Sequence, residues 1–172
     1  YEAGVTATTC EDNTGVGTST LRLTTTGCCN VAVGFQSMLA NTTGDSNTAS
    51  GWNALAGNTT GGSNVAMGRN ALGVSTTASN NTAVGTYALD ANTTGTPLVA
   101  LGVNALGANT TGANNVAVGP YALAVGTTHA NNTAVGFYAL SANTTAQNNT
   151  ALGWQSMTAN TTGAQNTAAG HG

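Results

Sequence analysis

Residues that could carry acid–base or metal chemistry are few in this chain, and their spacing brings none of them together. The histidines His129 and His171 lie far apart, whereas a catalytic pair needs hydrogen-bond contact. The many glycines match no phosphate-binding loop. We therefore expect no enzyme, cofactor or metal site, and both histidines are expected in exposed turns. The acids are equally scattered, at Glu2, Glu11, Asp12, Asp45 and Asp90.

Positive charge is almost absent, since Arg22 and Arg69 are the only cationic side chains and there is no lysine. Binding to nucleic acid or to an anionic membrane surface uses many Lys and Arg side chains. No apolar run approaches the ~18 residues of a membrane span, and the residues after Tyr1 lack the pattern of a signal peptide. We expect no nucleic-acid partner, no membrane insertion, and the mature part of an exported protein.

These few reactive residues are set in a repeat of seventeen residues that continues without insertion or deletion. Its motif is Asn-[Thr/Val]-Ala-[apolar]-Gly, with small variations, and its Asn is taken as position zero. Position four is always Gly, position eight is Leu or Met, and positions twelve and thirteen are Thr-Thr. The repeats start at Asn13, Asn30, Asn47, Asn64, Asn81, Leu98, Asn115, Asn132, Asn149 and Asn166.

A short period without insertions predicts that each repeat is one structural unit stacked on the last. Seventeen residues are too few for a pair of helices, but they suit one coil of a β-solenoid with two short strands and two turns. We therefore expect an all-β fold, a parallel β-solenoid of about ten coils that forms a single domain over residues 1–172. At a strand spacing of about 4.8 Å, the rod would be roughly 48 Å long.

Alternation within the motif predicts which side chains face the core. Positions one and three, such as Val31 and Val33, are β-branched or apolar and are expected inside, together with positions eight and ten. Positions two and seven would then face outward, although nearly all of them are Ala or Ser. Repeated small residues on an outward face suggest a second chain, or a bound glycan, packed closely against it.

Two columns of asparagine, at positions zero and eleven, suit ladders of side-chain amides that bond from coil to coil. The alternative is that Asn simply tolerates the turn geometry. Position eleven is also expected to face outward with the Thr of position thirteen, as a polar strip that could bind ice. Nine asparagines lie in glycosylation sequons: Asn41, Asn58, Asn92, Asn109, Asn143, Asn160, Asn80, Asn131 and Asn148.

Aromatic residues gather just after the invariant Gly. Position five accepts Trp52, Arg69 and Pro120 alike, which indicates an exposed turn. Aromatic side chains there could grip a carbohydrate or a neighbouring chain, or they could fill gaps beside the turn. The residues concerned are Phe35, Trp52, Tyr87, Tyr121, Phe137, Tyr138 and Trp154.

The three cysteines, Cys10, Cys28 and Cys29, are typical of disulfide formers if the protein is exported. Cys10 and Cys28 are about one coil apart, within the roughly 4.4–6.8 Å that a disulfide allows between Cα atoms. Their pairing is therefore favoured, and Cys29 would remain for a bond to another chain.

The strand motif resembles the repeated strand of trimeric autotransporter adhesin heads, in the copies Asn30-Val-Ala-Val-Gly34, Asn64 to Gly68 and Asn115 to Gly119. The longer stretch from Asn132 to Thr145 is similar to head-like repeats of phage tail fibres and other surface fibres. The resemblance covers almost the whole chain. It implies a left-handed parallel β-roll, three chains side by side, and an adhesive or fibrous role outside the cell.

Together these features predict a structural subunit of an extracellular fibre, built by stacking and lateral association of β-solenoid chains. The expected partner is the chain itself, as a lateral trimer or as a head-to-tail filament in which the last coil of one subunit stacks on the first coil of the next. The alternative to the filament is that this sequence is one segment of a longer fibre chain. The alternatives are an adhesin head or phage tail-fibre segment that binds a carbohydrate or a host surface, and an ice-binding solenoid. The expected location is extracellular, at a cell surface or on a virion fibre.

Overall fold

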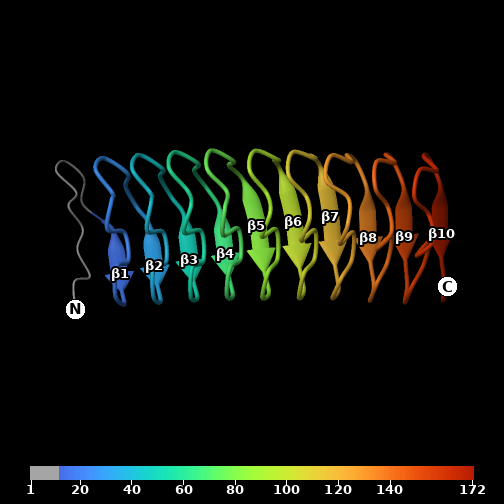
Figure 1. Ribbon diagram of the computed structural model, residues 1–172, viewed down its shortest axis with the longest axis horizontal. Coiled ribbons are helices and arrows are strands. Elements are labelled where there is room, and N and C mark those ends of the chain that lie inside the picture. Colours follow the sequence, from blue (N-terminus) through green and yellow to red (C-terminus); the bar gives the residue numbers. More distant parts are fainter. Residues whose placement is uncertain (1–11) are drawn as a thin grey trace.

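Ten parallel strands, one in each coil, form a single sheet along the rod (Figure 1). The computed structural model describes residues 12–172, and within them there is no helix. The expected all-β parallel solenoid is therefore confirmed. Each coil carries the number of its strand: β1 (Thr14–Val16), β2 (Val31–Val33), β3 (Thr48–Ser50), β4 (Val65–Met67), β5 (Asn81–Val84), β6 (Leu98–Leu101), β7 (Asn115–Val118), β8 (Thr133–Val135), β9 (Thr150–Leu152) and β10 (Thr167–Ala169).

The register of the sheet equals the period of the sequence. Ala32 pairs with Ala49, and Ala49 pairs with Ala66, so each step along the sheet is one repeat. The order of the strands follows the chain from β1 to β10 without a crossover. Residues one repeat apart therefore lie over one another, and each motif position forms a column along the rod.

Only one strand forms in each coil, whereas two were expected. The residues at positions six and eight have positive φ in all nine complete coils, as at Asn53 (φ 54°) and Leu55 (φ 53°). A residue in the left-handed region turns the chain away from the extended path, so two of them at alternate positions prevent a second strand. The second half of each coil is a series of turns.

Backbone hydrogen bonds join neighbouring coils in these turns as they do in the sheet. The Leu55 N–H donates to the Ala71 carbonyl at 2.9 Å, and the Thr59 N–H donates to the Thr76 carbonyl at 2.8 Å. Bonds of this kind satisfy donors that would otherwise be unpaired in a buried turn. The rod is therefore held together around most of its circumference.

The invariant Gly of position four is required for two reasons. Its φ lies between 123° and 141° in all ten coils, a region that other residues rarely adopt. At Gly68 a Cβ atom would also lie only 2.6 Å from the carbonyl oxygen of Gly85 in the next coil. The tight turn predicted at this position is confirmed.

The core is a narrow column built from Ala and Leu. Ala at position two and Ala or Ser at position seven are buried, as Ala66 and Ala71 show, and so is Leu at position eight, as at Leu72. A coil of seventeen residues encloses little space, and the Leu side chain from the turns occupies most of it. At position two of the strand, only a side chain as small as Ala fits beside that Leu side chain.

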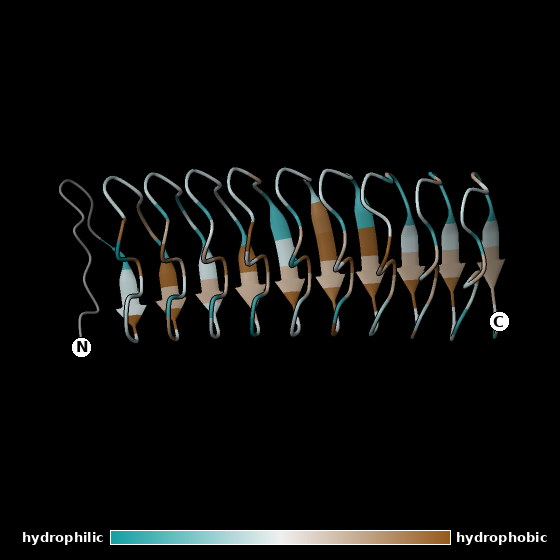
Figure 2. Ribbon diagram, viewed as in Figure 1, coloured by the Kyte–Doolittle hydropathy of each residue, from teal (hydrophilic) through white to brown (hydrophobic). Residues whose placement is uncertain are grey.

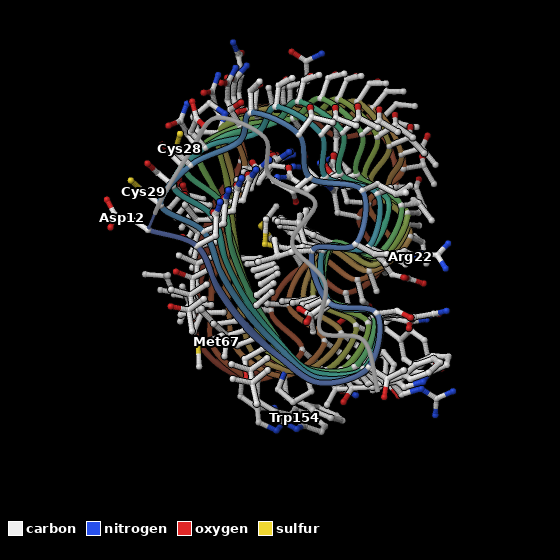
Figure 3. The ribbon with its side chains drawn as sticks, turned by 90° about the vertical axis from the view of Figure 1, so that its left-hand side faces the viewer. Asp12, Arg22, Cys28, Cys29, Met67 and Trp154 are labelled. Carbon is white, nitrogen blue, oxygen red and sulfur yellow. The ribbon has the colours of Figure 1, made fainter. Side chains whose placement is uncertain are left out.

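The predicted orientation of positions one, three, two, seven and ten is therefore wrong. Val31 and Val33 are exposed on the outside of β2, and Val74 at position ten is exposed as well. Met67 points away from the interior in the view along the rod (Figure 3). Positions two and seven are small because they pack in the core, so no second chain is needed to explain them.

Candidate assembly surface

Side chains able to do chemistry do not gather in the part of the chain that the structure describes. Between residues 12 and 172, no three His, Cys, Asp or Glu side chains lie close enough to hold a metal ion. No helix in that range is long and apolar enough to cross a membrane, and the same residues enclose no pocket. Glu2, Cys10 and Glu11 lie outside the described residues. The candidate site is therefore sought on the surface of the rod.

His129 is fully buried, contrary to the exposed turn predicted for it. It stands at position fourteen, where the other complete coils have Gly or Ala, and Gly126 of the same coil stands where most coils have Asn. A Cβ atom built on Gly126 would overlap the His129 ring at Cδ2. The imidazole therefore fills the space that the missing Asn side chain leaves. His171 is exposed as predicted.

The interior gives the His129 ring no hydrogen-bond partner. Both of its ring nitrogens are buried and unbonded. Because burial disfavours the charged imidazolium, the pKa of His129 lies below its ordinary value of 6.5. The coil that contains His129 has no Asp, Glu, Lys or Arg that could stabilise a charged ring. The neutral ring is therefore a packing element.

The asparagines at position zero form the predicted amide ladder, whereas the position-eleven column forms two bonded pairs, Asn41 with Asn58 and Asn92 with Asn109, on either side of Ser75. At position zero, the Asn64 Nδ2 donates to Asn47 Oδ1 at 3.0 Å and to the Ala78 carbonyl at 2.8 Å. At position eleven, the Asn58 Nδ2 donates to Asn41 Oδ1 at 2.8 Å. These amides bond within a coil and between coils, which stabilises the narrow interior.

The asparagine column at position eleven is buried, which corrects two predictions. The outward Asn–Thr strip of the ice-binding alternative lacks its Asn column, because these side chains face the core. A glycan on such an amide would replace a bonded N–H and has no room inside the coil. This burial contradicts glycosylation in the folded state at five sequons: Asn41, Asn58, Asn92, Asn109 and Asn143.

The remaining sequons lie nearer to solvent. Asn80, Asn131 and Asn148 are exposed at position sixteen, and Asn160 is half-buried. Glycosylation at these four residues stays a prediction.

The predicted aromatic cluster forms a ridge along one edge of the rod. The rings of Phe35 and Trp52 stack with their centroids 6.4 Å apart, and the Arg69 guanidinium lies 4.9 Å from the Trp52 centroid and 5.6 Å from that of Tyr87. Such contacts contribute beyond simple burial of area. The ridge therefore braces the coils against one another.

Further along the rod, the same ridge continues through a second group of rings. Tyr121 stacks on Tyr138 at 4.9 Å, and Phe137 stacks on Trp154 at 6.3 Å. The Trp154 ring also stacks on His171 at 4.4 Å. Because ring packs on ring from coil to coil, the faces on which a sugar would stack are largely covered, and the exposed edges suit a protein neighbour better.

The outer side of the sheet carries apolar side chains with Thr and Ser between them, and strands such as β2 and β6 are apolar along most of their length (Figure 2). We call it the sheet face. It has no charged residue in any coil. Its members are Thr14, Val31, Thr48, Val65, Thr82, Val99, Val116, Thr133, Thr150 and Thr167 at position one, and Val16, Val33, Ser50, Met67, Val84, Leu101, Val118, Val135, Leu152 and Ala169 at position three.

The size of the sheet face is typical of an interaction surface. Ten coils at about 4.8 Å and a width of roughly 10 Å give an area on the order of 500 Å². Patches of a few hundred Å² on a soluble protein commonly mark binding sites. The sheet face contains exposed Val33, Met67 and Leu101, so the apolar area is available to a partner.

The cysteine predictions remain open. Cys29 carries an exposed thiol, next to Cys28 in the turn before β2. Cys10 lies outside the described residues, so its pairing with Cys28 stays a prediction, as does a bond from Cys29 to another chain. Non-reducing electrophoresis checks the second, because an interchain bond would give a dimer that a reductant removes.

Comparisons of this chain with protein-family models, with curated proteins and with solved structures found no match. The assembly surface is therefore interpreted from its own geometry and chemistry.

Proposed function

We propose that this chain is a structural subunit of an extracellular fibre, in which β-solenoid rods associate laterally through their sheet faces and stack along their axes. The observation that carries the proposal is the uncharged sheet face, which exposes Val, Leu or Met side chains in most of its coils. Burial of apolar surface favours association by about 25 cal/mol per Å² before the costs of binding.

The regular spacing of the sheet face supports a partner of the same kind. Side chains in a column repeat at every coil, and a flat surface with that repeat is matched by another rod with the same repeat. Each coil then contributes a similar small amount, so the free energy of lateral association grows with the length of overlap.

Axial stacking is supported by the hydrogen bonds that join each coil to the next. The Thr48 N–H donates to the Asn64 carbonyl at 2.8 Å, and Asn64 bonds Asn47 through the ladder. A coil of a second chain can present the same donors and acceptors. Head-to-tail stacking would therefore repeat the contacts found inside the rod.

Lysine on the sheet face tests the lateral contact. Val84→Lys and Leu101→Lys place a charge on the exposed side of β5 and β6, so we expect rods that stay single in negative-stain images and in sedimentation. Thr94→Lys is the matched control, because Thr94 is exposed at position thirteen, away from the sheet. Circular dichroism establishes that each variant keeps the fold. Unchanged lateral assembly of both sheet-face variants would contradict the proposal.

A second candidate is a trimeric adhesive head at a cell surface or on a virion fibre. The apolar sheet face favours it too, because three rods could turn this face toward a common axis. The two candidates differ in stoichiometry. Sedimentation over a range of concentrations gives one closed species for a trimer and an open series for a fibre.

A further inference from the structure

A second apolar strip runs along the rod, on the side away from the sheet face. Arg22 of the neighbouring position nine points outward across the rod from Met67 (Figure 3). We call this surface the position-ten strip, and none of its residues is buried. All nine are apolar: Leu23, Ala40, Gly57, Val74, Ala91, Ala108, Val125, Ala142 and Ala159.

The position-ten strip has a longer period than the coil. Its large side chains, Leu23, Val74 and Val125, recur every third coil and are 47%, 50% and 50% exposed. Two coils with Ala or Gly lie between one large side chain and the next. The strip therefore alternates a protruding side chain with a shallow stretch, and the protrusions are about 14 Å apart at about 4.8 Å per coil.

Packing inside the coil does not explain this longer period, because position ten points outward. A surface that repeats every third coil is matched by a partner with the same repeat, and the chain itself is such a partner. If two copies lie antiparallel about a two-fold axis perpendicular to the rods, each column faces its own counterpart with the order of coils reversed. Position ten then faces position ten, and position nine faces position nine.

Two charged residues at position nine select one register of that pair. Arg22 is in coil 1 and Asp90 is in coil 5, about 19 Å apart at about 4.8 Å per coil, too far to pair within one rod. In an antiparallel pair centred on Gly57 of coil 3, Arg22 of each copy faces Asp90 of the other. The guanidinium has five N–H donors, so this pairing leaves room for contacts within its own chain.

The shape of the strip agrees with this register independently of charge. When Gly57 faces Gly57, Leu23 of coil 1 faces Ala91 of coil 5 in the second copy. Val74 of coil 4 likewise faces Ala40 of coil 2. Every protruding side chain in the overlap therefore meets a small one, and no two protrusions collide.

Asp90 is half-buried, and desolvation raises its pKa above its ordinary value. A positive charge placed opposite would stabilise the carboxylate in that setting.

We propose that a second copy of this chain docks antiparallel on the position-ten strip, in the register centred on Gly57. The inference rests on the self-association proposed above but uses a different surface, so each rod would have two lateral interfaces. Five coils overlap at these positions, on the order of 240 Å² per copy, which is well below the roughly 800 Å² per partner of a stable interface. The contact is therefore weak in an isolated pair and adds to the sheet-face contact in a fibre.

Disulfide trapping tests the register directly. In a Cys29→Ser background, the double variant Ala40→Cys, Val74→Cys places two thiols opposite two thiols across the pair. Within one rod these residues are two coils, about 10 Å, apart, beyond the reach of a disulfide. We expect a covalent dimer on mild oxidation, several-fold faster than for the matched control Ala40→Cys, Val125→Cys, which does not face itself in this register. Equal rates would overturn the proposal.

Charge reversal in the Ala40→Cys, Val74→Cys background provides the second measurement. We expect Arg22→Glu and Asp90→Arg each to slow dimer formation several-fold at low salt, and the two together to restore it. If the single reversals leave the rate unchanged, the register is wrong.

Adding Val84→Lys to the same background separates the two proposals. Trapping that persists while wide lateral assembly is lost supports both interfaces. Lateral assembly of the wild type without selective trapping removes the position-ten interface and leaves the proposed function in place. If the wild type shows no lateral assembly and the cysteine variant shows no selective trapping, both proposals are removed.

Discussion

Among single residues, the buried amides decide how firmly one coil holds the next. Asn64 donates to Asn47 Oδ1 and to the Ala78 carbonyl, and its own Oδ1 accepts the Asn81 N–H at 3.1 Å. Each lost partner leaves a buried polar group without a hydrogen bond, which costs about 1–3 kcal/mol.

The substitution Asn64→Ala is expected to lower the free energy of unfolding by about 3 kcal/mol, because several buried groups lose their partner together. Denaturant unfolding followed by circular dichroism measures the change. Thr60→Ala, at an exposed residue of position thirteen, is the control and is expected to stay within about 0.5 kcal/mol of the wild type. Equal effects for both variants would mean that the ladder adds nothing.

His129 makes stability depend on pH. Its pKa is lowered in the folded chain, so its contribution is fully present above the ordinary value of 6.5 and declines as the pH falls below it. The loss is at most about 1.4 kcal/mol per pH unit, because only the unfolded chain takes up the proton readily. Unfolding at about pH 5 and about pH 7.5 measures it.

The double variant Gly126→Asn, His129→Gly restores the residues of the other coils and is the control for this effect. It removes the buried imidazole and adds a side-chain amide that can donate to Asn109 Oδ1, which has no hydrogen-bond partner in the wild type. We expect a smaller loss of stability between the two pH values than in the wild type. The same loss in both proteins would contradict a neutral buried ring.

Within each coil, one strand and a set of left-handed turns replace the two strands that the alternation predicted. Leu at position eight adopts positive φ in coil after coil, as at Leu89 with φ 52°. For a branched side chain this conformation costs roughly 1–2 kcal/mol. Burial of the Leu side chain in the core offsets that cost, and propensity alone therefore predicts the wrong backbone here.

The Gly column at position four separates two causes of strain. In Gly68→Ala, the new methyl group meets the Gly85 carbonyl oxygen at 2.6 Å and also occupies an unfavourable φ. Gly170→Ala has the same problem of φ, but nothing lies within 4 Å of its Cβ position. We expect losses of about 3 kcal/mol and about 1 kcal/mol in the free energy of unfolding. Similar losses would show that close approach between coils is unimportant.

Along the whole rod, each coil contacts only its neighbours, so the number of coils can change without a change of fold. Deletion of residues 64–80 removes one full coil and joins position sixteen to position zero. We expect a folded rod that is shorter by about 4.8 Å in X-ray scattering and somewhat less stable. Deletion of residues 64–72 removes half a coil and puts the coils before and after it out of phase at one junction, so we expect a much larger loss of stability than for the full-coil deletion. Equal stabilities of the two deletion variants would contradict the stacking of columns.

The functional surfaces are less visible in the chain than the fold. The alternation of Val with Ala predicts the sheet face to be inside, although the near-invariant Ala of position two is the better signal of a confined core. The same alternation predicts position ten to be inside, whereas the recurrence of Leu23, Val74 and Val125 at every third coil is a signal of an exposed strip.

The repeat predicts the fold from the sequence alone, because identical residues at a constant spacing can all be buried or hydrogen-bonded in the same way only when coil stacks on coil. Coil number, parallel pairing, register and the amide ladder of position zero follow from that rule. Inside and outside do not follow from it, since both sides of a strand alternate with the same period. Their assignment depends on how much room a closed coil leaves beside Leu72, and on the gap at Gly126 that draws the His129 ring into the interior.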